Sequence, residues 1–272
     1  MSAANAPAKI NLALVVGPLR PDGKHEVSTV LQRVGLADSI SLERRPGIRV
    51  DGFEADTLVA DALAALAAEA SVEPDWHVTI EKRIPVAAGL GGGSADAATA
   101  LSLANATLDR PLLPERISAL AATIGADVPF FLASGSQLGT GTGTELEPLT
   151  LPLDYTVLLL LPDGAEKHST GAVYAAFDDR EGAEGFEERR EALTAALASV
   201  RESRDLAALP PNDLGSSPLA ANLTALGAFR ADVSGAGPVL YGLFETEADA
   251  RAAADDAGRL GRVWITAPTW YG

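Results

Sequence analysis

One stretch of the chain, residues 85–98 with the sequence PVAAGLGGGSADAA, has a composition suited to binding phosphate. Its glycines let successive backbone N–H groups approach an anion closely, because no side chain intervenes. We predict a helix from Ala95 to about Leu103 with Ser94 as its N-cap, so the positive end of the helix dipole would face the same anion. The lysine of a P-loop is absent, and Ser94 stands where a dinucleotide-binding fingerprint has its third glycine. The pattern favours an anion-binding loop over a plain turn.

Two charged residues in apolar surroundings have side chains that could take part in acid–base chemistry. Asp127 lies in the apolar stretch 124–131, where a buried carboxylate would need a cationic or hydrogen-bonding partner. Lys9 lies in the alternating stretch 8–16. Taken alone, each residue favours a structural interpretation: Asp127 as a helix cap or a salt-bridged aspartate, and Lys9 as an edge-strand lysine that keeps its ammonium in water. Phosphoryl transfer to a hydroxyl would require such a proton acceptor and such a cation.

The elements that would position these residues are a mixture of strands and helices. The segments with a strand pattern are 8–16, 76–81, 156–161, 231–244 and 262–267. The segments with a helical pattern, besides the one after the glycines, are 58–70, 184–204 and 247–260. A proline-containing stretch near residues 149–153 predicts a boundary that divides the chain into residues 1–152 and 153–272. The order of elements predicts a two-lobed α+β protein.

The composition excludes several classes of protein. Lys and Arg total 21 and Asp and Glu total 37, so the formal charge of 21 − 37 = −16 opposes non-specific binding to nucleic acid or anionic membranes. The lack of cysteine excludes disulfides and thiolate metal sites, and no histidine or carboxylate motif suggests a metal site built by the protein alone. No apolar run approaches the ~20 residues of a membrane-spanning helix. We expect a cytoplasmic protein that acts on a small molecule, with no nucleic-acid and no membrane partner.

Residues 89–98 resemble the ATP-binding loop of the GHMP kinases, the superfamily of galactose, homoserine, mevalonate and phosphomevalonate kinases. The sequence of this segment is most similar to that of the branch of the family that phosphorylates a cytidyl diphosphate-linked polyol. Other segments resemble the same branch and follow in the family's order across nearly the whole chain. They are residues 7–12, 22–26, 125–131, 169–174, 212–214 and 234–238. Each match is short, and their joint order makes the resemblance specific.

The resemblance implies a GHMP-kinase architecture with two lobes. The N-terminal lobe, residues 1–152, would be an ATP-binding lobe of the ribosomal-protein-S5-like type, and residues 153–272 would be a ferredoxin-like α/β lobe. The family's catalytic aspartate and lysine fall on Asp127, which would accept the hydroxyl proton, and on Lys9, which would neutralise charge at the transferring phosphoryl. ATP and Mg²⁺ are implied as cofactors. The implied nucleotide-binding residues are Pro85, Val86, Ala87, Ala88, Gly89, Leu90, Gly91, Gly92, Gly93, Ser94 and Ala95.

The resemblance also implies residues that recognise the substrate. Asn11, on the same strand face as Lys9, would orient it by hydrogen bonds. His25 matches the family's cytosine-contacting histidine, and Tyr174 would form one aromatic wall. Lys24 stands where the family has tyrosine, so it would offer the base an aliphatic stem without a π face.

Three alternatives follow from the places where the pattern departs from the family. Lys24 makes a GHMP kinase with a different small alcohol as substrate credible. A catalytically silent nucleotide-binding homologue is a second alternative, although the retention of Lys9 and Asp127 argues against it. A dehydrogenase is a distant third, because the glycine pattern fails. The repeated glycines of residues 139–143 either flank the substrate phosphates or form a plain hairpin turn.

Overall fold

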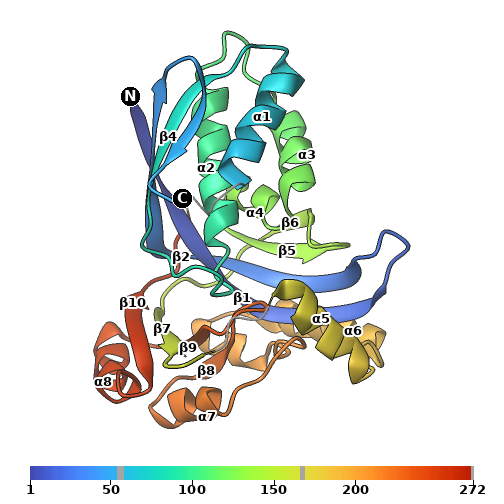
Figure 1. Cartoon of the computed structure of the whole chain (residues 1–272). Helices are drawn as coiled ribbons and strands as arrows, with labels where there is room; N and C mark the ends of the chain where they lie inside the picture. The colour runs from blue at the N-terminus through green and yellow to red at the C-terminus, as the bar shows by residue number, and fades with distance from the viewer. Residues whose placement is uncertain (54–57, 166–168, 271–272) are drawn as a thin grey trace.

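The computed structural model describes residues 1–53, 58–165 and 169–270, which form two β-sheets with helices packed against each (Figure 1). Among these residues the first sheet has six strands, in the order β3-β4-β2-β5-β6 with β1 paired to β2, and the second has four, β10-β7-β9-β8. The strands are β1 (Ser2–Leu19), β2 (His25–Arg44), β3 (Gly47–Asp51), β4 (Asp75–Glu81), β5 (Ser136–Thr140), β6 (Glu145–Leu149), β7 (Thr156–Pro162), β8 (Arg230–Val233), β9 (Leu240–Phe244) and β10 (Gly261–Thr266). The helices are α1 (Leu58–Ala70), α2 (Gly92–Asn105), α3 (Pro114–Ile124), α4 (Val128–Leu132), α5 (Thr170–Asp179), α6 (Phe186–Ser199), the 3₁₀ helix η1 (Ser203–Ala208), α7 (Pro218–Ala225) and α8 (Glu247–Ala257). This mixed α+β architecture confirms the predicted fold class.

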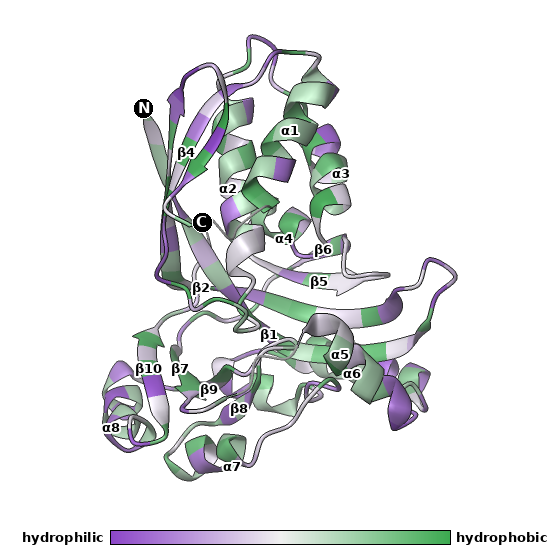
Figure 2. Ribbon diagram, in the orientation of Figure 1, coloured by the Kyte–Doolittle hydropathy of each residue, from purple (hydrophilic) through white to green (hydrophobic). Residues whose placement is uncertain are grey.

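Helices α1 to α4 cover one face of the first sheet, as Figure 1 shows. Helix α1 has the bounds predicted from its Ala and Leu pattern, and it buries Val59, Leu63 and Leu66 at the spacing of one helical face. These residues join buried side chains of α2 and β4 in one apolar core. Much of the α1 ribbon is green, the colour of hydrophobic residues, in Figure 2. The prediction of this helix from the sequence is confirmed.

Strand β1 runs between the two halves of the molecule, and both of its faces are buried along its centre. Its pairing with β2 shifts register between Asn11 and Ala13. Residues such as Ile10 and Leu12 share a core with Val157 and Tyr241 of the second sheet. The interpretation of Lys9 as an edge lysine with its ammonium in water is therefore wrong, because Lys9 is only 4% exposed.

Two predicted boundaries in glycine-rich segments differ from the structure. Helix α2 begins at Gly92 with Gly91 as its N-cap, so Ser94 lies in the first turn and is not the cap. Glycine has a low helix propensity, so the sequence alone predicts a helix that starts after the glycines. In the structure, packing against β1 and α1 stabilises a helix that already includes Gly92 and Gly93. The predicted strand 231–244 is two strands, β8 and β9, because residues 234–239 form the turn between them.

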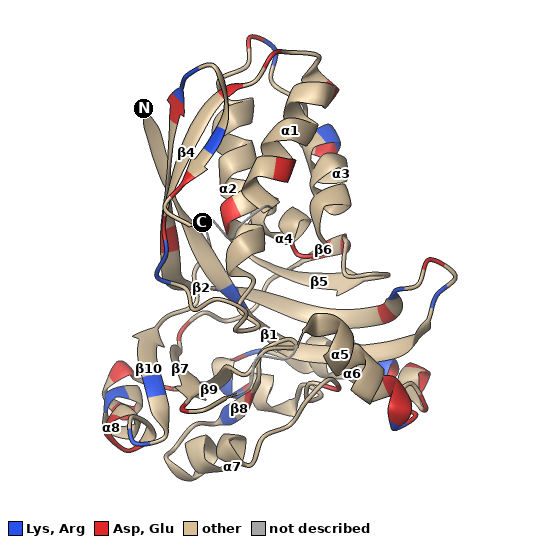
Figure 3. Ribbon diagram, viewed as in Figure 1, with Lys and Arg blue, Asp and Glu red and all other residues tan. Residues whose placement is uncertain are grey.

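Acidic residues lie on the outer helices, including α1, α3 and α8 (Figure 3). None of the helices in the described part of the chain is both long and apolar enough to cross a membrane. The boundary predicted between residues 152 and 153 lies in the connection from β6 to β7, and the division into lobes there stays a proposal.

Candidate active site

A cavity of about 670 Å³ lies where the glycine-rich segment faces β1, the start of α5 and the turn between β8 and β9. Segments far apart in the sequence meet here. The residues that line it include Lys9, Asn11, Thr29, Lys82, all of residues 85–94, Asp127, Thr142, Tyr174 and residues 235–237. The cavity thus collects most of the candidate site residues, with the exception of Lys24, His25 and Ala95.

Lys9 and Asp127 lie next to each other in this cavity. The Lys9 Nζ atom is 3.4 Å from Asp127 Oδ2, although 118 residues separate them in the sequence (127 − 9). Asp127 occupies the N-cap position of α4 but makes no capping hydrogen bond, and its side chain is 37% exposed. The carboxylate is therefore held beside a buried cation while it remains accessible from the cavity. This is the arrangement that a proton acceptor for a bound hydroxyl requires.

Asn11 is fixed by hydrogen bonds on both sides. Its Oδ1 accepts from Lys9 Nζ at 2.7 Å, and its Nδ2 donates to Thr29 Oγ1 at 2.8 Å. Thr29 in turn donates to the backbone carbonyl of Ala13 at 2.8 Å. This chain orients the Lys9 ammonium toward the cavity, so Asn11 positions the cation as well as lining the site. Thr29 was not among the residues singled out from the sequence, and nothing in its local pattern could have identified it.

The glycines of the loop allow two backbone segments to touch. Gly89 has a φ of +81°, and a Cβ on it would lie 2.0 Å from the carbonyl oxygen of Ser234. A Cβ on Gly237 would lie 2.1 Å from the backbone nitrogen of Gly89. The two glycine segments are thus packed backbone against backbone, and the Ser234 hydroxyl donates to the Gly89 carbonyl at 2.9 Å. Gly89 is required by this contact and by its left-handed conformation, and not only by the approach of a ligand.

The first turn of α2 presents backbone donors to the cavity. The first helical hydrogen bond runs from the Ala95 N–H to the Gly91 carbonyl at 2.9 Å. The N–H groups of Gly92, Gly93 and Ser94 therefore come before the intrahelical bonding pattern, and all three residues line the cavity. Together with the helix dipole they form a site for an anion such as phosphate.

Lys82, one of the residues that line the cavity, forms a largely buried ion cluster that was not predicted from the sequence. Lys82 Nζ donates to Asp38 Oδ2 at 2.6 Å and to Asp96 Oδ2 at 2.7 Å, and both carboxylates are fully buried. Burial alone would lower the pKa of Lys82, but the hydrogen bonds and charges of the two aspartates outweigh it and raise that pKa. The cluster ties β2, the entry to the loop, and α2 together. Its only sequence signal was the scarcity of lysine.

Arg33 is a second buried cation that supports the site. It is the cross-strand neighbour of Lys9, it is 1% exposed, and burial lowers its pKa to about 10. Its guanidinium donates to the carbonyl oxygens of Phe130 and Ala133, each at 2.5 Å. These carbonyls belong to the C-terminal end of α4, the helix that begins at Asp127. Arg33 therefore holds in place the helix that carries the candidate base.

The candidate base-recognition residues are only partly brought together. Tyr174 lines the cavity from α5, and burial together with the charge of Asp127 raises the pKa of its hydroxyl to about 12. His25 lies behind it, with ring centroids 4.9 Å apart at 28°, and its Nε2 is hydrogen-bonded to Asp178 Oδ1 at 2.8 Å. Lys24 is exposed in the β1–β2 turn and is not part of the cavity lining. The roles predicted for His25 and Lys24 stay predictions.

The repeated glycines of residues 139–143 connect β5 to β6 in a hairpin, with a hydrogen bond of 2.9 Å from the Gly143 N–H to the Thr140 carbonyl. Thr142 and Gly143, at the tip of this hairpin, also line the cavity. The two interpretations left open for this segment are therefore compatible, because the turn itself borders the site.

Comparison with known proteins identifies the family. The model of the GHMP kinases N terminal domain matches residues 57–135, and that of the GHMP kinases C terminal domain matches residues 216–262. The 4-diphosphocytidyl-2-C-methyl-D-erythritol kinase of Salinispora arenicola is 37% identical over 276 residues, which covers 93% of this chain and 87% of that protein. The enzyme of the same name from Rhodococcus jostii is 39% identical over 276 residues, with the same coverage.

Solved structures agree with these matches. A crystal structure of 4-(cytidine 5'-diphospho)-2C-methyl-D-erythritol kinase superposes with a TM-score of 0.79 at 31% identity, over 100% of both chains. A crystal structure of mevalonate kinase superposes with a TM-score of 0.80 over 100% of both chains at 13% identity, which shows a shared fold alone. The chain belongs to the 4-diphosphocytidyl-2-C-methyl-D-erythritol kinase family of the GHMP kinases.

Proposed function

We propose that this protein transfers the γ-phosphoryl group of ATP to the 2-hydroxyl of 4-diphosphocytidyl-2-C-methyl-D-erythritol, in non-mevalonate isoprenoid biosynthesis. The observation that carries the proposal is the pairing of Lys9 with Asp127 at 3.4 Å in a cavity whose wall is the glycine loop. The names of the relatives supply the acceptor. A cytoplasmic location fits an enzyme that uses ATP.

Residues 85–95 are proposed to hold the nucleotide. The N–H groups of Gly92, Gly93 and Ser94 fit the phosphates, because they precede the helical bonding pattern and face the cavity. Mg²⁺ bound to the nucleotide phosphates would neutralise part of their charge. No group of three or more His, Cys, Asp or Glu side chains placed to hold a metal occurs in the described part of the chain. The Ser94 hydroxyl, which lines the same cavity, would be available to hold such an ion together with the nucleotide phosphates.

In the proposed reaction, Asp127 accepts the proton of the acceptor hydroxyl as the hydroxyl oxygen forms its bond to the γ-phosphorus. The bond from that phosphorus to the β–γ bridging oxygen breaks, and ADP leaves with the negative charge. Lys9 lies beside Asp127 and offsets the charge that gathers on the transferring phosphoryl group. Asn11 holds the Lys9 ammonium and lies within reach of the acceptor. The hydrogen bonds of Lys9 and Asn11 exist before the substrates bind.

Base recognition is proposed to involve Tyr174, whose ring lines the cavity, with His25 stacked behind it. Asp178 fixes His25 from outside the cavity. Lys24 is exposed where the family has tyrosine, and this observation favours the second candidate function, a GHMP kinase acting on a different small alcohol.

An ATP-consumption assay with cytidyl, uridyl and simple alcohol acceptors tests both candidates. The first proposal requires rapid ADP release with the cytidyl acceptor and a new phosphate monoester on its 2-hydroxyl, visible by ³¹P NMR. Preference for another alcohol would support the second candidate. Nucleotide binding without turnover of any acceptor would indicate a silent homologue and contradict both.

A further inference from the structure

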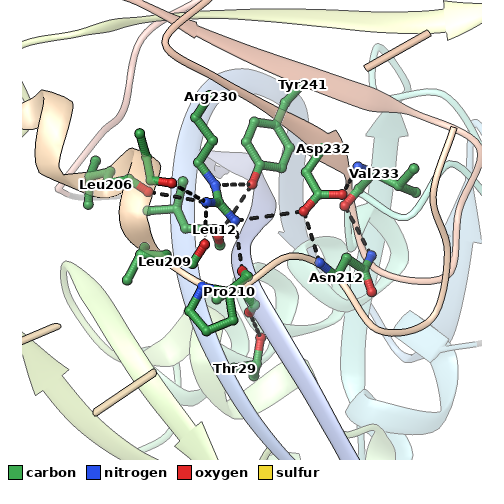
Figure 4. Close-up of polar contacts among 12 residues, drawn as sticks. Leu12, Thr29, Leu206, Leu209, Pro210, Asn212, Arg230, Asp232, Val233 and Tyr241 are labelled. Carbon is green, nitrogen blue, oxygen red and sulfur yellow. Dashed lines mark hydrogen bonds and ion pairs between the residues drawn. The ribbon is translucent and has the colours of Figure 1, made fainter. Parts of the chain in front are cut away.

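Buried polar side chains around Arg230, Asp232 and Asn212 form a network next to the turn between β8 and β9 (Figure 4). At its centre is Arg230, which is 7% exposed. Its guanidinium donates to the carbonyl oxygens of Leu209 at 2.6 Å and Pro210 at 2.8 Å, and to the Tyr241 hydroxyl at 3.1 Å. A buried arginine that bonds mainly to carbonyls fixes the course of the backbone it contacts, because each lost bond would leave a buried group unpaired. The backbone fixed here leads directly to Asn212.

Asp232 links Arg230 to Asn212. Its Oδ2 accepts from the Asn212 backbone N–H at 2.9 Å and lies 3.7 Å from the Arg230 guanidinium. Its Oδ1 accepts from the Val233 N–H at 2.7 Å. Burial raises the pKa of Asp232, although these backbone donors oppose that effect. The carboxylate thus sets the position of the Asn212 main chain.

The Asn212 side chain is fully used in bonds within the protein. Its Nδ2 donates to the carbonyl oxygens of Gly235 at 2.7 Å and Val233 at 3.0 Å, and its Oδ1 accepts from the Leu214 N–H at 2.9 Å. With 6% exposure, Asn212 has no role as a surface residue. Its two donors therefore hold the end of β8, at Val233, and the turn that follows it, at Gly235.

This turn borders the reacting groups. A Cβ on Gly235 would lie 3.3 Å from Asn11 Oδ1 and 3.4 Å from Lys9 Nζ. The neighbouring Ser234 donates its hydroxyl to the carbonyl of Gly89 in the nucleotide loop. A small movement of the turn would therefore displace the cation and the phosphate-binding backbone at the same time, since no side chain separates them.

The other branch of the network reaches the backbone of β1 next to Asn11. The Tyr241 hydroxyl donates to the carbonyl of Leu12 at 3.3 Å. Leu12 lies between Asn11 and Ala13, where the pairing of β1 with β2 shifts register. Arg230 is thus linked through Tyr241 to the backbone next to Asn11, and through Asp232 and Asn212 to the Gly235 carbonyl.

We propose that Asn212 is a positioning residue for phosphoryl transfer, because it fixes the Gly235 carbonyl and so holds residues 234–237 against Lys9, Asn11 and the nucleotide loop. Arg230 and Asp232 hold Asn212 in turn. The expected loss of kcat rests on the proposed function, whereas the effect of Asn212 on the turn can be measured separately by hydrogen exchange.

The test is Asn212→Asp, which keeps the shape of the side chain and replaces both N–H donors by an acceptor. We expect kcat to fall by about 10²-fold, the effect of a displacement of about 1 Å at reacting groups. The KM for the acceptor should change less, because Tyr174 is untouched. Amide hydrogen exchange in residues 233–240 and 86–91 should become about tenfold faster, the effect of losing roughly one net hydrogen bond. Exchange in α8 should stay as in the wild type.

The matched control is Asn222→Asp, the same chemical change at an exposed position of α7. It should leave kcat and exchange unchanged. Asn212→Ala, which removes the same donors without adding a charge, replaces Asn212→Asp if the latter does not fold. Unchanged kcat, unchanged exchange in 233–240, or exchange that rises equally in α8 would overturn the inference. If the wild-type chain transfers no phosphoryl group, the proposed function fails, and the exchange pattern alone decides whether Asn212 holds the turn.

Discussion

The buried cluster of Lys82 with Asp38 and Asp96 leads to a sharp prediction for Lys82→Met. The substitution keeps an unbranched apolar stem and removes the ammonium that lies 2.6 Å and 2.7 Å from two fully buried carboxylates. Removal of one partner of a buried ion pair costs about 3–5 kcal/mol, because the remaining charge is left uncompensated. A protein of this size loses about 2–4 °C of melting temperature per kcal/mol, so we expect Tm to fall by about 10 °C.

The pH dependence of that loss identifies its cause. In the wild type the pKa of Lys82 is raised above its ordinary value of 10.5, so its contribution to stability is fully present below pH 10.5 and is lost only as pH rises through the higher folded-state pKa. The wild-type contribution is therefore constant from pH 5 to pH 9. In Lys82→Met the two buried carboxylates gain from protonation, so the destabilisation should be smaller at pH 5 than at pH 8.

Thermal unfolding followed by circular dichroism measures the fall in Tm, and urea unfolding at pH 5 and pH 8 measures how the loss of stability depends on pH. Lys24→Met is the matched control, since it makes the same substitution in an exposed turn and should shift Tm by little. The double variant Lys82→Met with Asp38→Asn should recover part of the loss, because an asparagine oxygen can still accept from the Arg83 and Ile84 N–H groups. A Lys82→Met protein as stable as Lys24→Met, or one whose loss is equal at both pH values, would refute the electrostatic reasoning.

Three further expectations concern the site itself. Asp127→Asn should retain ATP binding by calorimetry and lose about 10²–10⁴-fold in kcat, as for other general bases, and near-normal turnover would remove Asp127 from that role. Gly89→Ala should weaken ATP binding and lower Tm, because its Cβ would lie 2.0 Å from the Ser234 carbonyl at a φ of +81°; a variant with wild-type affinity and Tm would show that the two segments can separate freely. Lys24→Tyr should tighten binding of a cytidyl acceptor by about 1–3 kcal/mol, the scale of one base–aromatic stack, and most of the gain should appear as a lower KM. A higher KM would mean that position 24 recognises charge.

Local patterns in the sequence were enough for the elements that depend on neighbours along the chain. The Ala- and Leu-rich composition of 58–70 predicts α1 with the bounds observed, because Ala and Leu have high helix propensities. The run 156–161 predicts β7, because a short continuous apolar stretch is typical of a buried strand. The strand ends at Pro162. The glycine loop was recognisable because few other residues allow a backbone to approach an anion. Even here the start of α2 was misplaced, because glycine propensity opposes a helix that tertiary packing stabilises.

The site required contacts that no local pattern contains. Lys9 and Asp127 each have an ordinary structural interpretation in isolation, and only the resemblance to the GHMP kinases pointed to their pairing before the structure placed them 3.4 Å apart. Lys82 carries no information about Asp38 or Asp96, because a salt bridge is specified by the distance between folded segments and not by spacing in the chain. The burial of Arg33 and Arg230 could not be predicted from the sequence either. An arginine is normally exposed, and it is tolerated in the interior only where groups such as backbone carbonyls accept its hydrogen bonds. The sequence by itself indicated strands β1, β4, β7 and β10, helices α1 and α8 and the glycine segments, but not elements such as β2, whose apolar pattern was not recognised. The tertiary structure decided which side chains face one another across them, because those contacts form only when distant parts of the chain close on a common core.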